Sequence, residues 1–268
     1  MGSDKQMNDV SKGFEIVASF PTLKKLPIII GESDPEGCAA CSVRFNPQNA
    51  YRNGTMYSSY TAATFARKNQ LATRHGINFE GAVTWAFEFE DQPYFDGFRD
   101  LATNGIDKPV LNVFRMFGLM DGQRLNVKSS GALSLDDILK SGVKAEPDIN
   151  AVATRGEKLI SIMAWNYHDD DLAGTAAPVS LKVAGVPATA SRALVRHYRI
   201  DRDHSNAYTA WLAMGSPQSP TPAQYAQLEA AGQLQSLGSP AWVPVKGGVV
   251  ELDFPLPRQA VSLVQVSW

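Results

Sequence analysis

Short apolar runs alternate with amphipathic stretches through the first 120 residues of the chain. The run at 26–31 is rich in isoleucine, and its length and composition predict a strand buried on both faces of a parallel sheet. A second apolar run, at 81–87, predicts another strand that also precedes clustered carboxylates. Between the two, apolar residues at helical spacing over 55–74 predict a helix that ends near Gly76 as its C-cap.

Two more helices are expected around this unit. Residues 9–20 have the pattern of the end of a helix, which stops at Pro21, and Pro109 is well placed to open a helix that runs through 120. Residues 32–54 form a long loop rich in Gly, Pro, Asn and Cys, and loops of this length are usually functional or disordered. The strand–helix–strand–helix order indicates an α/β architecture, and in a (β/α)8 barrel the catalytic groups lie at the carboxyl ends of such strands.

After residue 122 the pattern changes to short alternating or apolar segments. Strands are predicted at 150–154, 158–166, 178–184, 192–199, 241–245, 248–254 and 260–267. Their spacing is typical of an antiparallel β-sandwich, and Lys246-Gly247-Gly248 predicts a hairpin turn. Residues 221–232 predict one short helix with Thr221 as N-cap and Pro222 at its first position. We therefore expect a partial barrel over 1–122 and a sandwich domain over 123–268.

Composition narrows the possible functions. The 268 residues are 44% hydrophobic and 19% charged, as in a folded globular protein. A net charge of −2 provides no basic face for nucleic acid, and no apolar run approaches the roughly 18 residues of a membrane span. The first residues lack the charged, apolar and small-residue regions of a signal peptide, and the cellular location is left open.

The sequence contains two groups that resemble metal or redox motifs. Cys38 and Cys41 form a C-x-x-C pair, but a zinc site would need a second ligand pair and a thioredoxin-like centre would need a different context. Two thiols or a local disulfide shaping the loop after Glu32 is the favoured interpretation. The run 168–171, His-Asp-Asp-Asp, has hard oxygen ligands but lacks the spacing of a calcium loop, so it is interpreted as a solvated turn. No metal and no cofactor are expected.

Two parallel strands cannot close a barrel that needs eight, and their edges would stay unpaired. Either the chain is a piece of a longer protein, or another molecule supplies the missing part. A homo-oligomer that rebuilds a barrel from two chains is one form of the second alternative.

Several segments, taken together, resemble family 39 of the glycoside hydrolases, and in particular its bacterial β-xylosidases. The matching segments are Pro27–Glu32, Thr84–Asp91, Pro109–Phe117 and Ile162–Tyr167. The resemblance implies a (β/α)8 TIM barrel with an accessory β-sandwich, of which this chain is the C-terminal half, from barrel strand 7 onward. It also implies retaining hydrolysis that removes terminal xylose from β-1,4-xylooligosaccharides.

The resemblance assigns roles to a few residues. Glu32 matches the catalytic nucleophile at the end of the seventh barrel strand, and Trp85 matches the aromatic that lines the sugar pocket. Glu88, Glu90 and Asp91 lie near an acidic pair that contacts the sugar. This acidic segment is shorter than in the family, and Glu32 is followed by Ser-Asp rather than by an aromatic. The acid/base glutamate of the family follows an asparagine, and no Asn-Glu pair occurs in the sequence.

Retaining hydrolysis needs two carboxyl groups about 5–5.5 Å apart, one to attack and one to protonate the leaving oxygen. With one of them missing, we expect the chain alone to have severely reduced activity or none. The alternative is a non-catalytic fragment, or a carbohydrate-binding or structural sandwich module to which Trp211 and Trp242 contribute. In that case Glu32 is an ordinary loop carboxylate and Trp85 a core residue.

Overall fold

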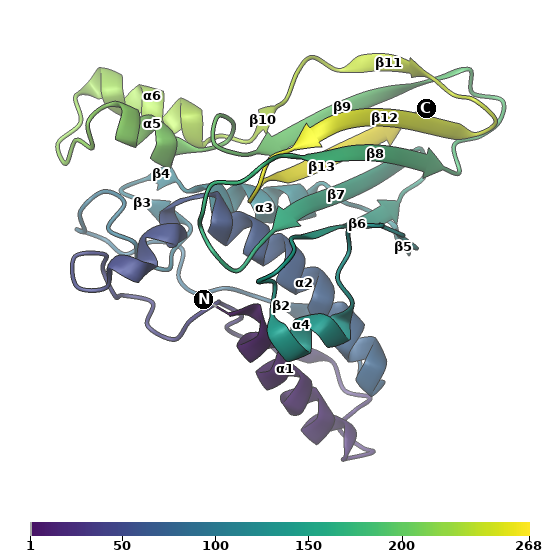
Figure 1. Cartoon of the computed structure of the whole chain (residues 1–268), viewed down its shortest axis with the longest axis horizontal. Coiled ribbons are helices and arrows are strands. Elements are labelled where there is room, and N and C mark those ends of the chain that lie inside the picture. The colour runs from purple at the N-terminus through teal and green to yellow at the C-terminus, as the bar shows by residue number, and fades with distance from the viewer. Residues whose placement is uncertain (1) are drawn as a thin grey trace.

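The computed structural model describes residues 2–268 and places a set of helices beneath a β-sandwich (Figure 1). The first part of the chain contains α1 (Ser3–Ala18), β1 (Ile28–Ile30), a 3-10 helix η1 (Pro47–Asn53), α2 (Thr55–His75), β2 (Phe79–Ala82), β3 (Ala102–Thr103), β4 (Ile106–Asp107) and α3 (Pro109–Gly118). The predicted helices are present, and Gly76 ends α2 in the left-handed conformation, as expected of a C-cap. The loop predicted over 32–54 ends in η1.

β1 and β2 form a parallel pair, but they are shorter than predicted. Ile28 and Ile30 pack on the core that α1 and α2 share, whereas the side chain of Ile29 is 61% exposed. The expectation of burial on both faces is therefore wrong for β1, because no further strand or side chain in the described residues covers its second face. β2 ends at Ala82 rather than at 87, because beyond Val83 the backbone bonds to a loop carboxylate instead of to β1.

The second part of the chain is antiparallel and forms two stacked sheets. Its elements are β5 (Gln123–Leu125), α4 (Leu135–Ser141), β6 (Asp148–Arg155), β7 (Leu159–Tyr167), β8 (Ala177–Ala184), β9 (Arg192–Ile200), α5 (Ala207–Ala213), α6 (Pro222–Gly232), β10 (Gln235–Ser236), β11 (Ala241–Pro244), β12 (Val249–Leu256) and β13 (Val261–Ser267). The larger sheet has the order β10-β9-β13-β7-β6-β5, with β11 also on β9, and the smaller sheet is β12-β8.

All strands predicted for this part exist, and α6 begins with the expected Thr221 cap. The turn predicted at Lys246-Gly247-Gly248 is present, because Lys246 and Val249 form an antiparallel bridge around two glycines with positive φ, but the strands on either side do not pair with each other. β11 pairs with β9 and β12 pairs with β8, so the turn carries the chain from one sheet to the other. α4, α5, β5 and β10 were not anticipated. The division of the chain at residues 122 and 123 stays a prediction.

Helix α2 lies between the parallel strands and the larger sheet, and it gives both a common core. Tyr60 and Leu71 of α2 belong to the same hydrophobic core as Trp165 of β7, and Ile28 and Ile30 of β1 pack against that core. In Figure 1, α2 crosses beneath the larger sheet with α1 below it. Within residues 2–268, no helix is long and apolar enough to span a membrane.

A buried acid fixes α2 to the sandwich. Asp148, at the start of β6, accepts hydrogen bonds from Arg67 of α2 at 2.7 Å, from the indole N–H of Trp165 at 3.0 Å and from the amide of Leu133 at 2.9 Å. Both partners of the ion pair are buried. The ion pair therefore connects α2 specifically to the sandwich.

A second buried acid lies in the segment interpreted as a solvated turn. Asp169 is buried and accepts hydrogen bonds from the amides of Ser3 and Val143 and from the hydroxyl of Tyr167. His168 is buried as well, so that interpretation is wrong for these two residues. Asp169 secures the first residue of α1 to the sandwich instead of facing water.

Replacing Asp148 by alanine should destabilise the protein by about 3–5 kcal/mol, because Arg67 would be left as an uncompensated buried charge. The control is Asp136→Ala, which breaks an exposed ion pair with Arg74 and should cost less than about 1 kcal/mol. Urea unfolding measures both. Equal effects would show that Asp148 does not fasten α2.

Candidate active site

Glu32 lies two residues beyond the end of β1, separated from the strand by Gly31. Its side chain is 50% exposed, and one carboxylate oxygen accepts a hydrogen bond from the Nη2 of Arg99. The guanidinium of Arg99 is itself buried, which lowers its pKa, and it also donates to the backbone oxygen of Glu36. Glu32 is thus an accessible carboxylate with one fixed cationic partner.

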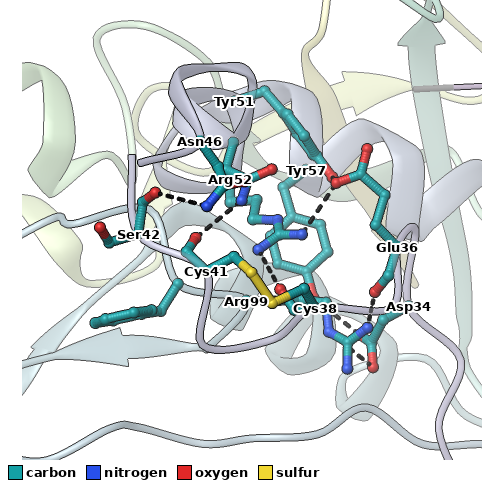
Figure 2. Close-up of polar contacts among 12 residues, drawn as sticks. Asp34, Glu36, Cys38, Cys41, Ser42, Asn46, Tyr51, Arg52, Tyr57 and Arg99 are labelled. Atoms are coloured by element: carbon teal, nitrogen blue, oxygen red, sulfur yellow. Dashed lines mark hydrogen bonds and ion pairs between the residues drawn. A yellow bond between two sulfur atoms is a disulfide. The ribbon is translucent and has the colours of Figure 1, made fainter. Parts of the chain in front are cut away.

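Asp34 connects the loops that follow the two parallel strands. One of its carboxylate oxygens accepts from the hydroxyls of Tyr57, at 2.9 Å, and Thr84. The other accepts from the backbone N–H of Trp85 at 3.2 Å and lies 3.6 Å from the Nε of Arg99. Burial raises the pKa of Asp34, against the opposite effect of these hydrogen bonds. Figure 2 shows Asp34, Tyr57 and Arg99 converging at this point.

The backbone N–H of Trp85 donates to Asp34, and this bond places Trp85 beside Asp34 and Arg99. Its indole is 51% exposed and meets the ring of Phe89 edge to face, with centroids 5.6 Å apart. Phe89 in turn contacts the buried Phe98, at 5.3 Å. The indole therefore packs on Phe89 and is half exposed to solvent, so it is not a core residue.

The three carboxylates after Trp85 do not join this cluster. Glu88 accepts a hydrogen bond from the amide of Gly105 at 2.8 Å, in the turn between β3 and β4. Glu90 and Asp91 are exposed, and their side chains have no hydrogen bond to any described residue. The structure thus brings Glu32, Asp34, Trp85 and Arg99 together, and the sugar-binding roles of Glu88, Glu90 and Asp91 stay predictions.

A compact network holds the loop after Asp34. The carboxylate of Glu36 accepts from the hydroxyl of Tyr51 at 2.9 Å and from Arg52 Nη2 at 3.0 Å. Cys38 and Cys41 form a disulfide, with Cα atoms 5.5 Å apart, and the Cys38 carbonyl accepts from Arg52 Nη1 at 2.9 Å. The sequence favoured either two free thiols or a local disulfide at this place, and the structure contains the disulfide. Figure 2 shows the bridge beside Arg52, so this arginine supports the loop from within.

A cleft of about 440 Å³ lies beside Glu32 and faces α1. Val10 and Phe14 of α1 and Ile28 and Ile30 of β1 provide its apolar lining. Trp85 does not line this cleft, which follows the unpaired edge of β1. The cleft is therefore a consequence of the incomplete parallel sheet and is not a pocket walled by both Glu32 and Trp85.

Lys68 of α2 is buried behind the site, and its ammonium has no hydrogen-bond partner among the described residues. Burial lowers the pKa of Lys68 to about 7, and the negative charge of Asp34 acts in the opposite direction. The nitrogen lies 4.5 Å from the ring centre of Phe65. Lys68 is thus a buried amine without a hydrogen-bond partner among the described residues, and its charged form is disfavoured by burial.

Chemically, the arrangement offers one accessible carboxylate for attack. Asp34 is engaged by several donors, and no other described carboxylate within hydrogen-bonding reach of Arg99 is free to act as a general acid. Sequence reasoning missed Arg99, Asp34 and Lys68. Asp34 follows Glu32 closely enough to be suspected, whereas Arg99 lies in an irregular segment with no pattern that marks it.

The family model for glycosyl hydrolases family 39 matches residues 1–246, and the chain belongs to this family. Mouse α-L-iduronidase is 30% identical to the chain over 167 residues, which are 59% of this chain and 25% of the mouse protein. The family and the structural neighbours imply a fold in which a TIM barrel is joined to a β-sandwich, and the structure contains one pair of parallel strands and a sandwich.

Three solved structures have similar folds. The GH39 enzyme from Xanthomonas axonopodis pv. citri has a TM-score of 0.74 at 17% identity, with coverage of 98% of this chain and 48% of the other. A monomeric β-xylosidase from Caulobacter crescentus has a TM-score of 0.74 at 18% identity, covering 100% and 50%. A bacterial orthologue of human α-L-iduronidase has a TM-score of 0.79 at 19% identity, covering 97% and 46%. The chain spans about half the length of these proteins.

Removing the Asp34 carboxylate should free the segment that carries Trp85. In Asp34→Ala, amide exchange at Trp85 should accelerate by about tenfold or more, because a hydrogen bond to a charged acceptor is lost. Glu90→Ala, which removes an exposed carboxylate from the same segment, should leave the rate unchanged. Similar exchange rates at Trp85 in the two variants would contradict the linking role of Asp34.

The buried ammonium of Lys68 predicts a pH-dependent stability. Its pKa of about 7 in the folded chain lies below the ordinary 10.5, so protonation favours the unfolded chain, and the cost fades as pH rises from 7 towards 10.5. Lys68→Met should therefore gain on the order of 4 kcal/mol below pH 7 and progressively less above it. Urea unfolding at several pH values, with the exposed Lys182→Met as control, measures this. A gain independent of pH would refute it.

Proposed function

We propose that this chain supplies the nucleophile of a retaining glycoside hydrolase that removes terminal xylose from β-1,4-xylooligosaccharides, an enzyme of the xylan 1,4-β-xylosidase type. The observation that carries the proposal is the half-exposed carboxylate of Glu32, at the carboxyl end of a parallel strand and paired with Arg99. In a (β/α)8 barrel, this is where catalytic side chains are found.

In this reaction the Glu32 carboxylate attacks the anomeric carbon, and the bond to the leaving oxygen breaks as a glycosyl-enzyme ester forms. The neighbouring guanidinium favours the charged form of a carboxylate, which is the form that attacks. A second carboxyl group protonates the leaving oxygen and then activates water. This group would come from outside the chain, so the chain alone should show severely reduced or no activity.

Trp85 would provide the flat apolar surface on which the pyranose ring stacks, and Asp34 would hold it at a fixed position relative to Glu32. Glu88, Glu90 and Asp91 would accept hydrogen bonds from the sugar hydroxyls. A change of side-chain orientation would be needed for Glu88, which is engaged by Gly105.

The mouse relative is an α-L-iduronidase, so an α-L-iduronide is a second candidate substrate. Such a sugar carries a carboxylate and calls for a free cationic partner, whereas Arg99 is occupied by Glu32, Asp34 and Glu36. This favours the uncharged xyloside.

Replacing Glu32 by alanine in the enzyme of which this chain is part should reduce hydrolysis of an aryl β-xyloside by a factor on the order of 10⁴ to 10⁶. Added azide should restore release of the aryl group by replacing the missing nucleophile, and Glu80→Ala, an exposed carboxylate on β2, is the matched control. Retention of the full rate would reject the assignment. If the unaltered enzyme hydrolysed an aryl α-L-iduronide faster than the aryl β-xyloside, the iduronide would be assigned as the substrate instead.

The non-catalytic alternative rests on Trp242 of β11, which is exposed and lies under the guanidinium of Arg192 at 4.5 Å. Trp211, by contrast, is buried against Phe95 and Tyr208 and offers no platform. Titration with xylobiose, followed by tryptophan fluorescence, distinguishes the two sites: a signal abolished by Trp85→Ala supports the enzyme, and one abolished by Trp242→Ala supports a binding module.

Completion of the barrel by another chain, or by a second copy, remains part of the proposal and is tested by the mass in solution.

A further inference from the structure

Residues 85–99, which we call the rim segment, connect two residues of the candidate site and contain no helix or strand. The segment begins at Trp85 and ends at Arg99, the partner of Glu32. Phe89 of the same segment packs edge to face on the Trp85 indole. The position of the indole therefore depends on how the rim segment is held.

The middle of the rim segment is bound by the second part of the chain. Gln218, in the connection between α5 and α6, accepts a hydrogen bond from the amide of Tyr94 at 2.8 Å and donates one to its carbonyl at 3.1 Å. One side chain thus pairs with both backbone groups of Tyr94, as a residue of a neighbouring strand would. Figure 1 shows α5 and α6 at one end of the sandwich, above β3 and β4.

Phe95, the next residue, is held in a pocket made by α5. Its ring is 3% exposed and packs on Trp211 and Tyr208, with centroids 5.1 and 5.4 Å away. Its backbone is bonded by the side chains of Asn53, at 2.7 Å, and Thr103, at 3.1 Å. The φ of Phe95 is 51°, a left-handed value that bulky residues rarely adopt. Such a conformation persists only where the surroundings impose it, and it is found mostly at functional sites.

The contacts to Tyr94 and Phe95 form one closed arrangement. The indole N–H of Trp211 donates to the carbonyl of Pro217 at 2.9 Å, and Pro217 directly precedes Gln218. Trp211 therefore packs on Phe95 with its ring and fixes the place of Gln218 with its N–H. Since Tyr94 and Phe95 are consecutive, each of the two contacts supports the other.

We infer that Gln218 and Trp211 are positioning residues of the sugar site, through which the sandwich part of the chain holds the rim segment where Trp85 can meet the sugar. The inference rests on the proposed function, because it requires that the sugar stacks on Trp85. Both residues act through the backbone of Tyr94 and the ring of Phe95. The sandwich is then a working part of the site and not an independent module.

The residues that would carry out the chemical step are held separately. The amide of Arg99 donates to the carbonyl of Ala39 at 2.9 Å, and its guanidinium donates to Glu32 and to the carbonyl of Glu36. These bonds lie in the loop that follows Glu32 and do not involve α5 or α6. A loosened rim segment should therefore weaken sugar binding, seen as a higher KM, and leave kcat nearly unchanged.

The first test uses the full chain without sugar. Hydrogen exchange of residues 88–95, followed by mass spectrometry, should accelerate by about tenfold in Gln218→Ala, because Tyr94 loses both of its partners. The matched control is Ser219→Ala, the neighbouring exposed residue, which should leave exchange unchanged. Trp211→Phe keeps an aromatic ring on Phe95 but removes the bond to Pro217, and it should accelerate exchange in the same residues. If Trp211→Phe does not fold, Gln218→Ala and its control still decide.

The second test uses the enzyme of which this chain is part and an aryl β-xyloside. Gln218→Ala should raise KM by about tenfold and change kcat by less than about twofold, whereas Ser219→Ala should change neither. Gln218→Glu keeps an acceptor for the Tyr94 amide and should restore part of the lost affinity.

Two results would overturn the inference: unchanged exchange of residues 88–95 in Gln218→Ala, or faster exchange with an unchanged KM, since the role would then be structural only. If the unaltered enzyme does not hydrolyse the xyloside, the proposed function fails instead. The exchange experiment then decides by itself whether Gln218 holds the rim segment.

Discussion

The fold depends on α2 having two apolar partners at once. A pair of parallel strands buries too little surface to be stable by itself, and β1 leaves Ile29 largely in water. The larger sheet supplies additional buried apolar surface, because Tyr60 and Leu71 of α2 belong to a core that also contains Trp165. The buried Arg67–Asp148 pair then connects the helix to the sheet. The pair of parallel strands is thereby stabilised by the sandwich.

The same arrangement explains how Glu32 can be positioned on two short strands. Backbone hydrogen bonds connect the two segments as far as Ser33 and Val83, and beyond these residues side chains position the loops. Asp34 joins the two loops, and Arg99 joins Asp34 to Glu32. The position of Trp85 relative to Glu32 therefore depends on one buried carboxylate, and any change to that carboxylate affects both loops.

Sequence patterns predicted most elements of this structure correctly, because the strands of the sandwich have clear alternation and α6 has a capping box. They failed where a tertiary contact overrides local preference. β2 stops at Ala82 although the apolar run continues to 87, since the Trp85 amide turns to Asp34. Lys246-Gly247-Gly248 has hairpin chemistry, yet the strands on either side belong to different sheets. Glu32 and Trp85 could be found from motifs, whereas Arg99 could not, because an arginine in an irregular segment is identified only by what it contacts.

The bridge between Cys38 and Cys41 has a practical consequence. The carbonyl of Cys38 receives a hydrogen bond from Arg52, and Arg52 also holds Glu36 in the loop that follows Glu32. A thiol reductant would open the ring and give this segment more conformational freedom. Samples handled with and without such reagents are then chemically distinct species, and a mixture of the two would behave as a heterogeneous preparation in which the loop after Glu32 differs between molecules.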